Sequence, residues 1–316
     1  MQYIPLEKPI AELEDKILEL KRLASAQAIN LDHEIEKLET RCHNVRDELF
    51  SNLSPYQTAQ IARHPGRPRF QDLMREICSF FVELHGDRNF FDDPAIVGGL
   101  GTIGKQSCVL IGHQKGKGTK DNIYRNFGMP KPEGYRKALR IMSMAERFNL
   151  PIITFVDTPG AYPGIGAEQR GQAEAIAKNI MVMSKLKVPI ITVIVGEGGS
   201  GGALALAVAN RVLMLENSIY SVISPEGCAS ILMKDASKAP MAADALKLTA
   251  QNAKANKIID TIIKEPLGGA HRNIEKTATS LKRHILKAIK ELSEMSGTEL
   301  MNHRVDKFNE MGKVVQ

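Results

Sequence analysis

Two almost uninterrupted apolar segments, PIITFVD at 151–157 and VPIITVIVG at 188–196, constrain the fold of this chain more than any other feature. Each has the length of a strand and is shorter than most helices. Continuous apolar runs of this kind are typical of parallel strands that are covered on both faces. Parallel strands need a crossover connection, and the segment 167–186 between them predicts a helix. The pair therefore predicts the centre of an α/β core.

The surrounding chain continues this alternation of strands and helices. Further strands are expected at 95–103, 107–112, 211–216 and 219–224. Helices are expected at 133–148, at 201–210 and from residue 273 onward. The first two strands flank a Gly-Lys turn and predict a hairpin. The repetition of strand and helix supports an α/β fold class.

The N-terminal region shows a different, purely helical pattern. Apolar residues recur at spacings of three and four at Ile10, Leu13, Ile17 and Leu20, and again at Leu31, Ile35, Leu38, Cys42, Val45 and Leu49. This spacing predicts two amphipathic helices that form a hairpin. Their apolar seam must be buried, either within their own chain or against another subunit. We therefore expect a helical hairpin arm (1–52), a core (53–270) and a C-terminal helical segment (271–316).

Composition excludes several classes of protein. The chain has 316 residues, 43% hydrophobic and 25% charged, as in ordinary folded domains. No apolar run approaches the roughly 18 residues that a membrane span needs, and the acidic start does not resemble a secretory signal. The cysteines are far apart, without a CxxC zinc pair. We expect a cytoplasmic protein with reduced cysteines and no membrane partner.

The positive charge is concentrated in one stretch, 113–140. It holds eight basic residues against Asp121 and Glu133, so it carries the whole net charge of +6. The basic residues are Lys115, Lys117, Lys120, Arg125, Lys131, Arg136, Lys137 and Arg140. Such a stretch forms either a solvated face or a site for an anionic ligand or acidic partner. Nucleic acid is not favoured, because few aromatic residues accompany the charges.

A glycine cluster at 196–202, GEGGSGG, is the strongest chemical signal. Gly196, Gly198 and Gly201 fit a dinucleotide fingerprint with Glu216 after the next strand, but the intervening helix is short. The same segment fits a hydrolase nucleophile elbow at Ser200. A triad would then need Asp260 and His271. A stand-alone α/β hydrolase or a dinucleotide-binding enzyme thus remains the alternative reading.

The physical property shared by these motifs is an accessible backbone. Consecutive glycines after a strand let a ligand approach unpaired N–H groups closely. Such donors can stabilise a developing negative oxygen, commonly by about 3–4 kcal/mol each. The histidines, among them His113 and His271, have no second ligand at helical spacing, so the sequence predicts packing or solvent roles and no metal site.

Five blocks carry a family resemblance. GEGGSGGALA, with the blocks at 125–142, 155–164, 223–232 and 265–273, resembles the carboxyltransferase alpha subunits of bacterial and plastid multi-subunit acetyl-CoA carboxylases. The resemblance runs in order from about Pro9 to about His303. It implies a crotonase-like spiral of ββα units for the core, flanked by the N-terminal hairpin and C-terminal helices.

The resemblance also implies an activity and partners. The activity is transfer of a carboxyl group from carboxybiotin, on the biotin carboxyl carrier protein, to acetyl-CoA, giving malonyl-CoA for fatty acid biosynthesis. The partners are a zinc-bearing beta subunit, in a complex of two alpha and two beta chains, and biotin carboxylase. No cofactor is expected on this chain, and the absence of CxxC fits the alpha role.

Site residues follow from the same resemblance. Gly201 and Gly202 are expected to present the backbone amides of an oxyanion hole for biotin, with the matching hole for the thioester on the beta chain. The cleft lining is expected to include Gly198, Gly199, Gly160, Ala161, Tyr162 and Gly164. The stretch 113–140 is the candidate for the phosphates of coenzyme A.

Overall fold

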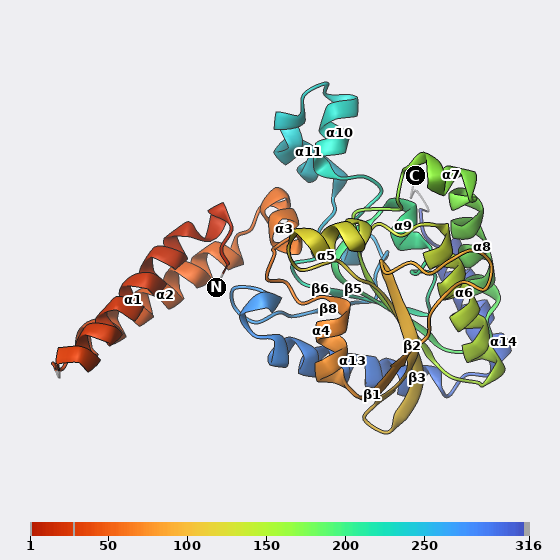
Figure 1. The fold of residues 1–316 in the computed structure, drawn as a ribbon, viewed down its shortest axis with the longest axis horizontal. Coiled ribbons are helices and arrows are strands. Elements are labelled where there is room, and N and C mark those ends of the chain that lie inside the picture. The colour runs from red at the N-terminus through yellow and green to blue at the C-terminus, as the bar shows by residue number, and fades with distance from the viewer. Residues whose placement is uncertain (1, 28, 313–316) are drawn as a thin grey trace.

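The computed structural model describes residues 2–27 and 29–312, and its centre is one mixed sheet (Figure 1). The sheet order is β1-β2-β3-β4-β5-β6-β8, and β7 pairs with the end of β5. The strands are β1 (Cys78–Glu83), β2 (Ile96–Ile103), β3 (Gln106–His113), β4 (Ile152–Thr158), β5 (Ile190–Gly199), β6 (Arg211–Leu215), β7 (Ile219–Ser221) and β8 (Thr261–Ile263). From β3 to β8 every pairing is parallel, whereas β1, β2 and β3 are antiparallel.

Helices cover both faces of the sheet, and others lie outside it. The α-helices are α1 (Lys8–Gln27), α2 (Asp32–Ser51), α3 (Pro55–Ala62), α4 (Phe70–Ile77), α5 (Gly118–Tyr124), α6 (Pro132–Arg147), α7 (Ile165–Gln169), α8 (Gln172–Lys185), α9 (Ser200–Leu204), α10 (Pro225–Leu232), α11 (Ala239–Leu246), α12 (Ala250–Ala255), α13 (Ile274–Leu292) and α14 (Gly297–Asn309). In Figure 1, α6 and α8 lie on one side of the sheet and α4 and α13 on the other.

The two apolar segments at 151–157 and 188–196 are the buried centre of the sheet, as predicted. In β4, Ile152 and Val156 face the core beneath α6 and α8, whereas Ile153 and Phe155 face the core beneath α4 and α13. Successive side chains of a strand point to opposite faces. A strand with helices on both faces therefore needs apolar residues at every position, which is why the run is continuous.

Several boundaries differ from the expectation. The strand predicted to end at residue 196 continues through Gly199, and the helix predicted at 201–210 is only the short α9. The helix predicted at 167–186 is divided into α7 and α8 by Gly171, whose φ of 79° is left-handed. The strand predicted at 219–224 is only the three-residue β7, whereas the hairpin predicted at 95–112 is confirmed as β2 and β3. The sequence analysis did not identify β1, β8, α3, α4, α5 or α10–α12.

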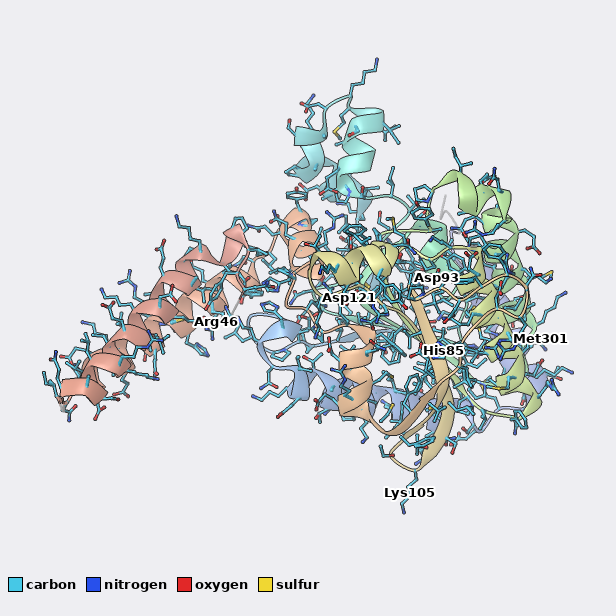
Figure 2. All side chains as sticks on the ribbon, viewed as in Figure 1. Arg46, His85, Asp93, Lys105, Asp121 and Met301 are labelled. Atoms are coloured by element: carbon cyan, nitrogen blue, oxygen red, sulfur yellow. The ribbon has the colours of Figure 1, made fainter. Side chains whose placement is uncertain are left out.

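The N-terminal arm projects from the core as an antiparallel pair of helices (Figure 1). Its predicted seam is partly closed between α1 and α2, where Ile10, Ile35 and Cys42 are buried. Farther along the seam, Ile17 and Leu20 are only half-buried, and Leu18 and Leu23, which lie outside the predicted seam, are exposed. Arg46 lies on the inner half of the arm (Figure 2), where it pairs with Glu14 of α1. The helical hairpin prediction is therefore confirmed, with a seam that the chain buries only in part.

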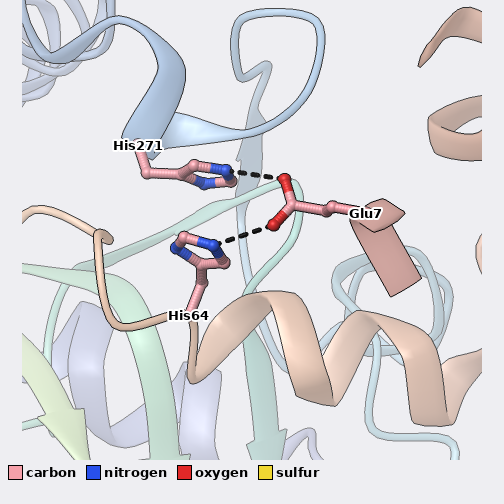
Figure 3. Close-up of side chains that lie close together, drawn as sticks. All are labelled: Glu7, His64 and His271. Carbon is pink, nitrogen blue, oxygen red and sulfur yellow. Dashed lines mark hydrogen bonds and ion pairs between the residues drawn. The ribbon is translucent and has the colours of Figure 1, made fainter. Parts of the chain in front are cut away.

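A buried polar clamp fixes the base of the arm to the core (Figure 3). The Glu7 carboxylate lies 2.8 Å from His64 Nε2 and 3.1 Å from His271 Nε2. All three side chains are almost fully buried, and the two rings stack with centroids 3.8 Å apart. The backbone N–H of Gly66 donates to His64 Nδ1, so the proton of that ring stays on Nε2 and faces Glu7. The packing role predicted for His271 is confirmed.

Replacing Glu7 by glutamine tests this clamp. An amide cannot accept from both imidazoles, so E7Q should lower the free energy of unfolding by about 2–3 kcal/mol at neutral pH. Burial alone would raise the pKa of Glu7, but contacts from the two histidines hold it well below its ordinary 4.5. Below about pH 4.5 the unfolded chain takes up a proton that folded Glu7 refuses, so the advantage of wild type should shrink there. Denaturant titration at pH 7 and pH 4 measures both effects, and equal stability of E7Q and wild type at pH 7 would contradict the clamp.

Candidate active site

The glycine cluster lies where the central strand ends. β5 extends through Gly198 and Gly199, and Gly198 sits between Thr158 of β4 and Tyr220 of β7. Ser200 follows in a left-handed conformation, with φ of 53°, and opens α9. The chain thus turns sharply at the carboxyl edge of the parallel sheet. Ligand sites of open α/β sheets are typically found at this edge.

Close backbone packing explains why most of these positions are glycine. A β-carbon on Gly199 would lie 2.2 Å from the carbonyl oxygen of Pro159. One on Gly202 would lie 2.6 Å from the backbone nitrogen of Ala161 and 2.7 Å from the carbonyl carbon of Gly160. The structure therefore brings the turn after β4 and the glycine cluster into direct contact. The structure thus brings together four residues that the sequence analysis grouped: Gly160, Ala161, Gly199 and Gly202.

Gly201 differs from its neighbours. A β-carbon there would make only an ordinary contact, 3.8 Å from Ile176. Among the described residues, no hydrogen bond is recorded from the N–H of Gly201 or from that of Gly202. Gly201 is half-buried and Gly202 is buried. The turn thus contains two backbone donors without protein partners.

Tyr162 and Gly164 extend this surface toward α6. The N–H of Tyr162 donates to the carbonyl of Pro130. The Gln172 side chain donates to the carbonyl of Pro130 and to that of Tyr162. The Lys131 ammonium lies 5.5 Å from the centre of the Tyr162 ring. A β-carbon on Gly164 would lie 2.3 Å from the same ring. The turn 160–164 is therefore held by the segment before α6.

A buried ion network lies directly beneath the glycine turn. Lys115 Nζ is 2.7 Å from Asp157 Oδ1 and 2.6 Å from Glu197 Oε2. Arg63 joins Glu197 at 2.6 Å and Glu226 at 2.8 Å. The backbone N–H of Glu197 also donates to Asp157. The network links the carboxyl ends of β4 and β5 to the segment after β3.

The network keeps both central carboxyl groups ionised. Burial alone would raise the pKa of Asp157 and of Glu197, but Lys115 beside both carboxylates holds the pKa of each below its usual value. Arg63 adds to this effect at Glu197. Removing one partner from such a buried set leaves an uncompensated charge, which is strongly destabilising. The sequence analysis missed these roles, although Glu197 within the glycine motif was the available signal.

Most of the basic residues of the stretch 113–140 are engaged within the chain, whereas Lys117 and Lys120 are exposed. Lys115 is buried in the network, and buried Lys137 contacts Asp92 at 2.5 Å. Arg136 pairs with Asp87 at 2.8 Å. Arg125 pairs with Asp121 and donates to the carbonyl of Pro94, and Arg140 donates to the carbonyls of His85 and Gly86. These last four side chains, from Lys137, Arg136, Arg125 and Arg140, hold the loop that carries His85 and Asp93 (Figure 2).

The hydrolase triad is not assembled. Asp260 accepts from the backbone N–H of Val212 and pairs with Lys307, whereas His271 belongs to the clamp with Glu7. No contact within the described chain joins either residue to Ser200. The interpretation as a dinucleotide-binding site is not supported either, because α9 is short and the Glu216 carboxylate pairs with Lys264. Neither alternative is supported.

The clamp at Glu7, His64 and His271 is the one group of potential metal ligands in the described chain that lies close together. Its geometry does not fit a metal. The imidazole planes are nearly parallel, at 16°, so their Nε2 lone pairs do not converge on one point. His64 also accepts a hydrogen bond at Nδ1, whereas a metal-bound histidine normally donates there.

Within the described residues no helix is long and apolar enough to cross a bilayer.

The contrast between Gly201 and Gly202 gives a direct stability test. G202A forces a methyl group into the backbone of 160–161 and should lower the free energy of unfolding by about 1–3 kcal/mol. G201A places the methyl at ordinary contact distance and should remain within about 0.5 kcal/mol of wild type. Thermal melts of both variants decide this, and equal losses would show that the close approach at Gly202 is not as described.

Comparison with known proteins agrees with this geometry. The family described as acetyl co-enzyme A carboxylase carboxyltransferase-like matches residues 3–312. A protein of Geobacter metallireducens named acetyl-coenzyme A carboxylase carboxyl transferase subunit alpha is 56% identical over 313 residues, covering 99% of this chain and 98% of the relative. A Paraburkholderia phymatum protein of the same name is 55% identical over 311 residues, covering 98% and 96%.

Solved structures support the fold. A transcarboxylase 12S structure aligns with a TM-score of 0.60 at 20% identity, covering 74% of this chain and 44% of that one. A Pseudomonas malonate decarboxylase hetero-tetramer in complex with coenzyme A aligns with a TM-score of 0.56 at 14% identity, covering 67% and 85%. The expected crotonase-like α/β fold is thereby confirmed. The chain belongs to the acetyl co-enzyme A carboxylase carboxyltransferase-like family.

Proposed function

We propose that this chain is the alpha subunit of a biotin-dependent carboxyltransferase that, with a beta subunit, moves a carboxyl group from carboxybiotin to acetyl-CoA. The observation that carries this proposal is the pair of unpartnered backbone amides at Gly201 and Gly202 at the carboxyl edge of the sheet. The curated relatives of nearly full length bear the corresponding name.

The chemistry needs stabilised oxygens more than a protein acid or base. The bond between the biotin nitrogen and the carboxyl carbon breaks, and its electron pair flows into the ureido group. That nitrogen takes a proton from the acetyl methyl group, and the resulting enolate attacks the released carbon dioxide. The products are biotin and malonyl-CoA, so atoms and charge balance. Backbone N–H groups aimed at the ureido oxygen favour this change without supplying a proton.

The electrostatic setting suits this role. Lys115 lies between two carboxylates and therefore presents no free positive charge to the turn. A strong cation beside the ureido oxygen would lower the basicity of the biotin nitrogen, which must take the proton. Neutral amide donors stabilise the ureido oxygen and leave the biotin nitrogen more basic than a cation would. Gly198, Gly199, Gly160, Ala161, Tyr162 and Gly164 would line the cleft that receives the biotin ring.

The thioester oxygen requires a second set of donors, which we assign to the beta subunit. We further propose two alpha and two beta chains, zinc on the beta chain alone, and delivery of carboxybiotin by the biotin carboxyl carrier protein after biotin carboxylase has loaded it. Because most of the stretch 113–140 is engaged internally, the beta chain would hold most of the coenzyme A phosphates. The four cysteines are free, which supports a cytoplasmic site of action.

The purified chain by itself should form no malonyl-CoA from carboxybiotin and acetyl-CoA, because one oxyanion site is on the partner. Addition of the beta subunit should restore turnover. Malonyl-CoA is measured by mass spectrometry with the chain alone, the beta subunit alone and the two together. Turnover by the chain alone would refute the shared site.

Ser200 separates this function from the hydrolase reading. S200A removes the only nucleophile of that motif but keeps every backbone amide, so the assembled enzyme should retain carboxyl transfer within about threefold, whereas a hydrolase would lose about 10⁴-fold or more. S200G is the matched control, because glycine tolerates the left-handed φ of 53° better than alanine. Loss of activity in both variants beyond tenfold, with normal assembly, would contradict catalysis by the backbone.

A further inference from the structure

Two buried polar side chains lie directly behind Gly202 and have no role in the function proposed above. Tyr135 comes from α6, and its hydroxyl oxygen lies 3.0 Å from the position that a β-carbon on Gly202 would occupy. His113 ends β3, and its ring lies within hydrogen-bonding reach of the backbones of Phe155 and Gly202. The exposed fraction is 0% for Tyr135 and 1% for His113.

The polar atoms of both side chains are poorly satisfied. The Tyr135 hydroxyl has no hydrogen-bond partner within the described structure, and neither ring nitrogen of His113 makes a hydrogen bond of good geometry with the nearby backbones of Phe155 and Gly202. Each poorly satisfied buried group lowers the stability of the fold, and native proteins contain few of them. Apolar side chains of similar size would not carry this cost. Polar atoms kept at a stability cost, on one side of a single glycine, are typical of a functional site.

Both groups are electrically neutral. Burial lowers the pKa of His113 to about 4, so the imidazole carries no proton charge at neutral pH. Burial also raises the pKa of Tyr135 far above its ordinary value, so the phenol keeps its proton. The charged groups that face His113 are Asp157 and Lys115, which are paired with each other. The environment behind Gly202 is therefore polar but uncharged.

We propose that His113 and Tyr135 are positioning residues for carboxyl transfer. Tyr135 lies where a β-carbon of Gly202 would point and His113 lies beside the Gly202 backbone, and together they hold its N–H toward the ureido oxygen of biotin. The two side chains fix and polarise the turn. Because both are neutral, they do so without bringing a positive charge near the biotin nitrogen. This inference rests on the proposed function, and it identifies the biotin side of the reaction as the side that these residues serve.

The test is to remove the polar atoms. Y135F keeps the ring, so it should assemble with the beta subunit and should melt at the wild-type temperature or above it, because it removes an unsatisfied buried atom. H113F also removes the polar atoms and should assemble, but its larger ring enters a fully buried place and lowers the melting temperature slightly by its size alone. Their kcat should fall about tenfold or more, since small displacements of a catalytic group reduce rate strongly. KM for acetyl-CoA should change less than twofold. Release of carbon dioxide from carboxybiotin without acetyl-CoA should fall in parallel with kcat.

Two further variants complete the design. H113Q keeps one polar group near the turn and should recover part of the rate that H113F loses. Y3F is the matched control, because the Tyr3 hydroxyl does have a partner, Glu14 of the N-terminal arm. Y3F should therefore lower the melting temperature and leave kcat unchanged, which is the opposite of the result expected for Y135F.

The outcomes are distinguishable. Wild-type kcat in both Y135F and H113F would overturn the inference while leaving the proposed function intact. A fall in kcat of Y135F that merely follows a fall in melting temperature or in subunit assembly would also overturn it. Failure of the wild-type assembly to form malonyl-CoA would refute the proposed function itself, and the inference with it. Lower kcat of Y135F with normal stability, normal KM and slower carbon dioxide release would support it.

Discussion

The buried ammonium of Lys115 between Asp157 and Glu197 is the interaction on which the site depends. These residues close three adjacent strands at their carboxyl ends, and the glycine turn begins one residue after Glu197. A β-carbon on Gly196 would lie 2.3 Å from Asp157 Oδ1, so that glycine makes room for the network. Because Lys115 is matched by two carboxylates, it fixes the strand ends without placing a free charge at the turn.

The turn itself is defined by backbone contact. Gly199 and Gly202 approach the segment 159–161 so closely that a side chain at either position would displace backbone atoms. Packing therefore requires glycine at Gly202 whether or not its N–H has a catalytic role, and loss of activity in G202A would not separate the two. Tyr135 allows a sharper test, because phenylalanine removes its hydroxyl and keeps the packing of its ring.

Charge in this protein is used mainly to hold structure in place. Basic residues of the stretch 113–140 bind the loop that follows β1, and the Glu7 clamp attaches the arm at its base. Both sets are assembled from segments far apart in the chain. The exposed apolar residues of the arm, Leu18 and Leu23, and those of α10 remain on surfaces that this chain does not cover. A protein that acts with a partner subunit is consistent with such surfaces.

The sequence by itself determined the α/β core, the helical arm and the glycine turn, because continuous apolar runs, heptad spacing and consecutive glycines are local patterns with local physical causes. The five blocks also identified the family. What only the tertiary structure decided was how distant side chains pair. The stretch 113–140 looked like a free basic face because its acidic partners, such as Asp87 and Asp157, lie far away in sequence. His64, His113 and Tyr135 carried no signal, since their burial and the groups that face them are decided only once the strands and helices have packed.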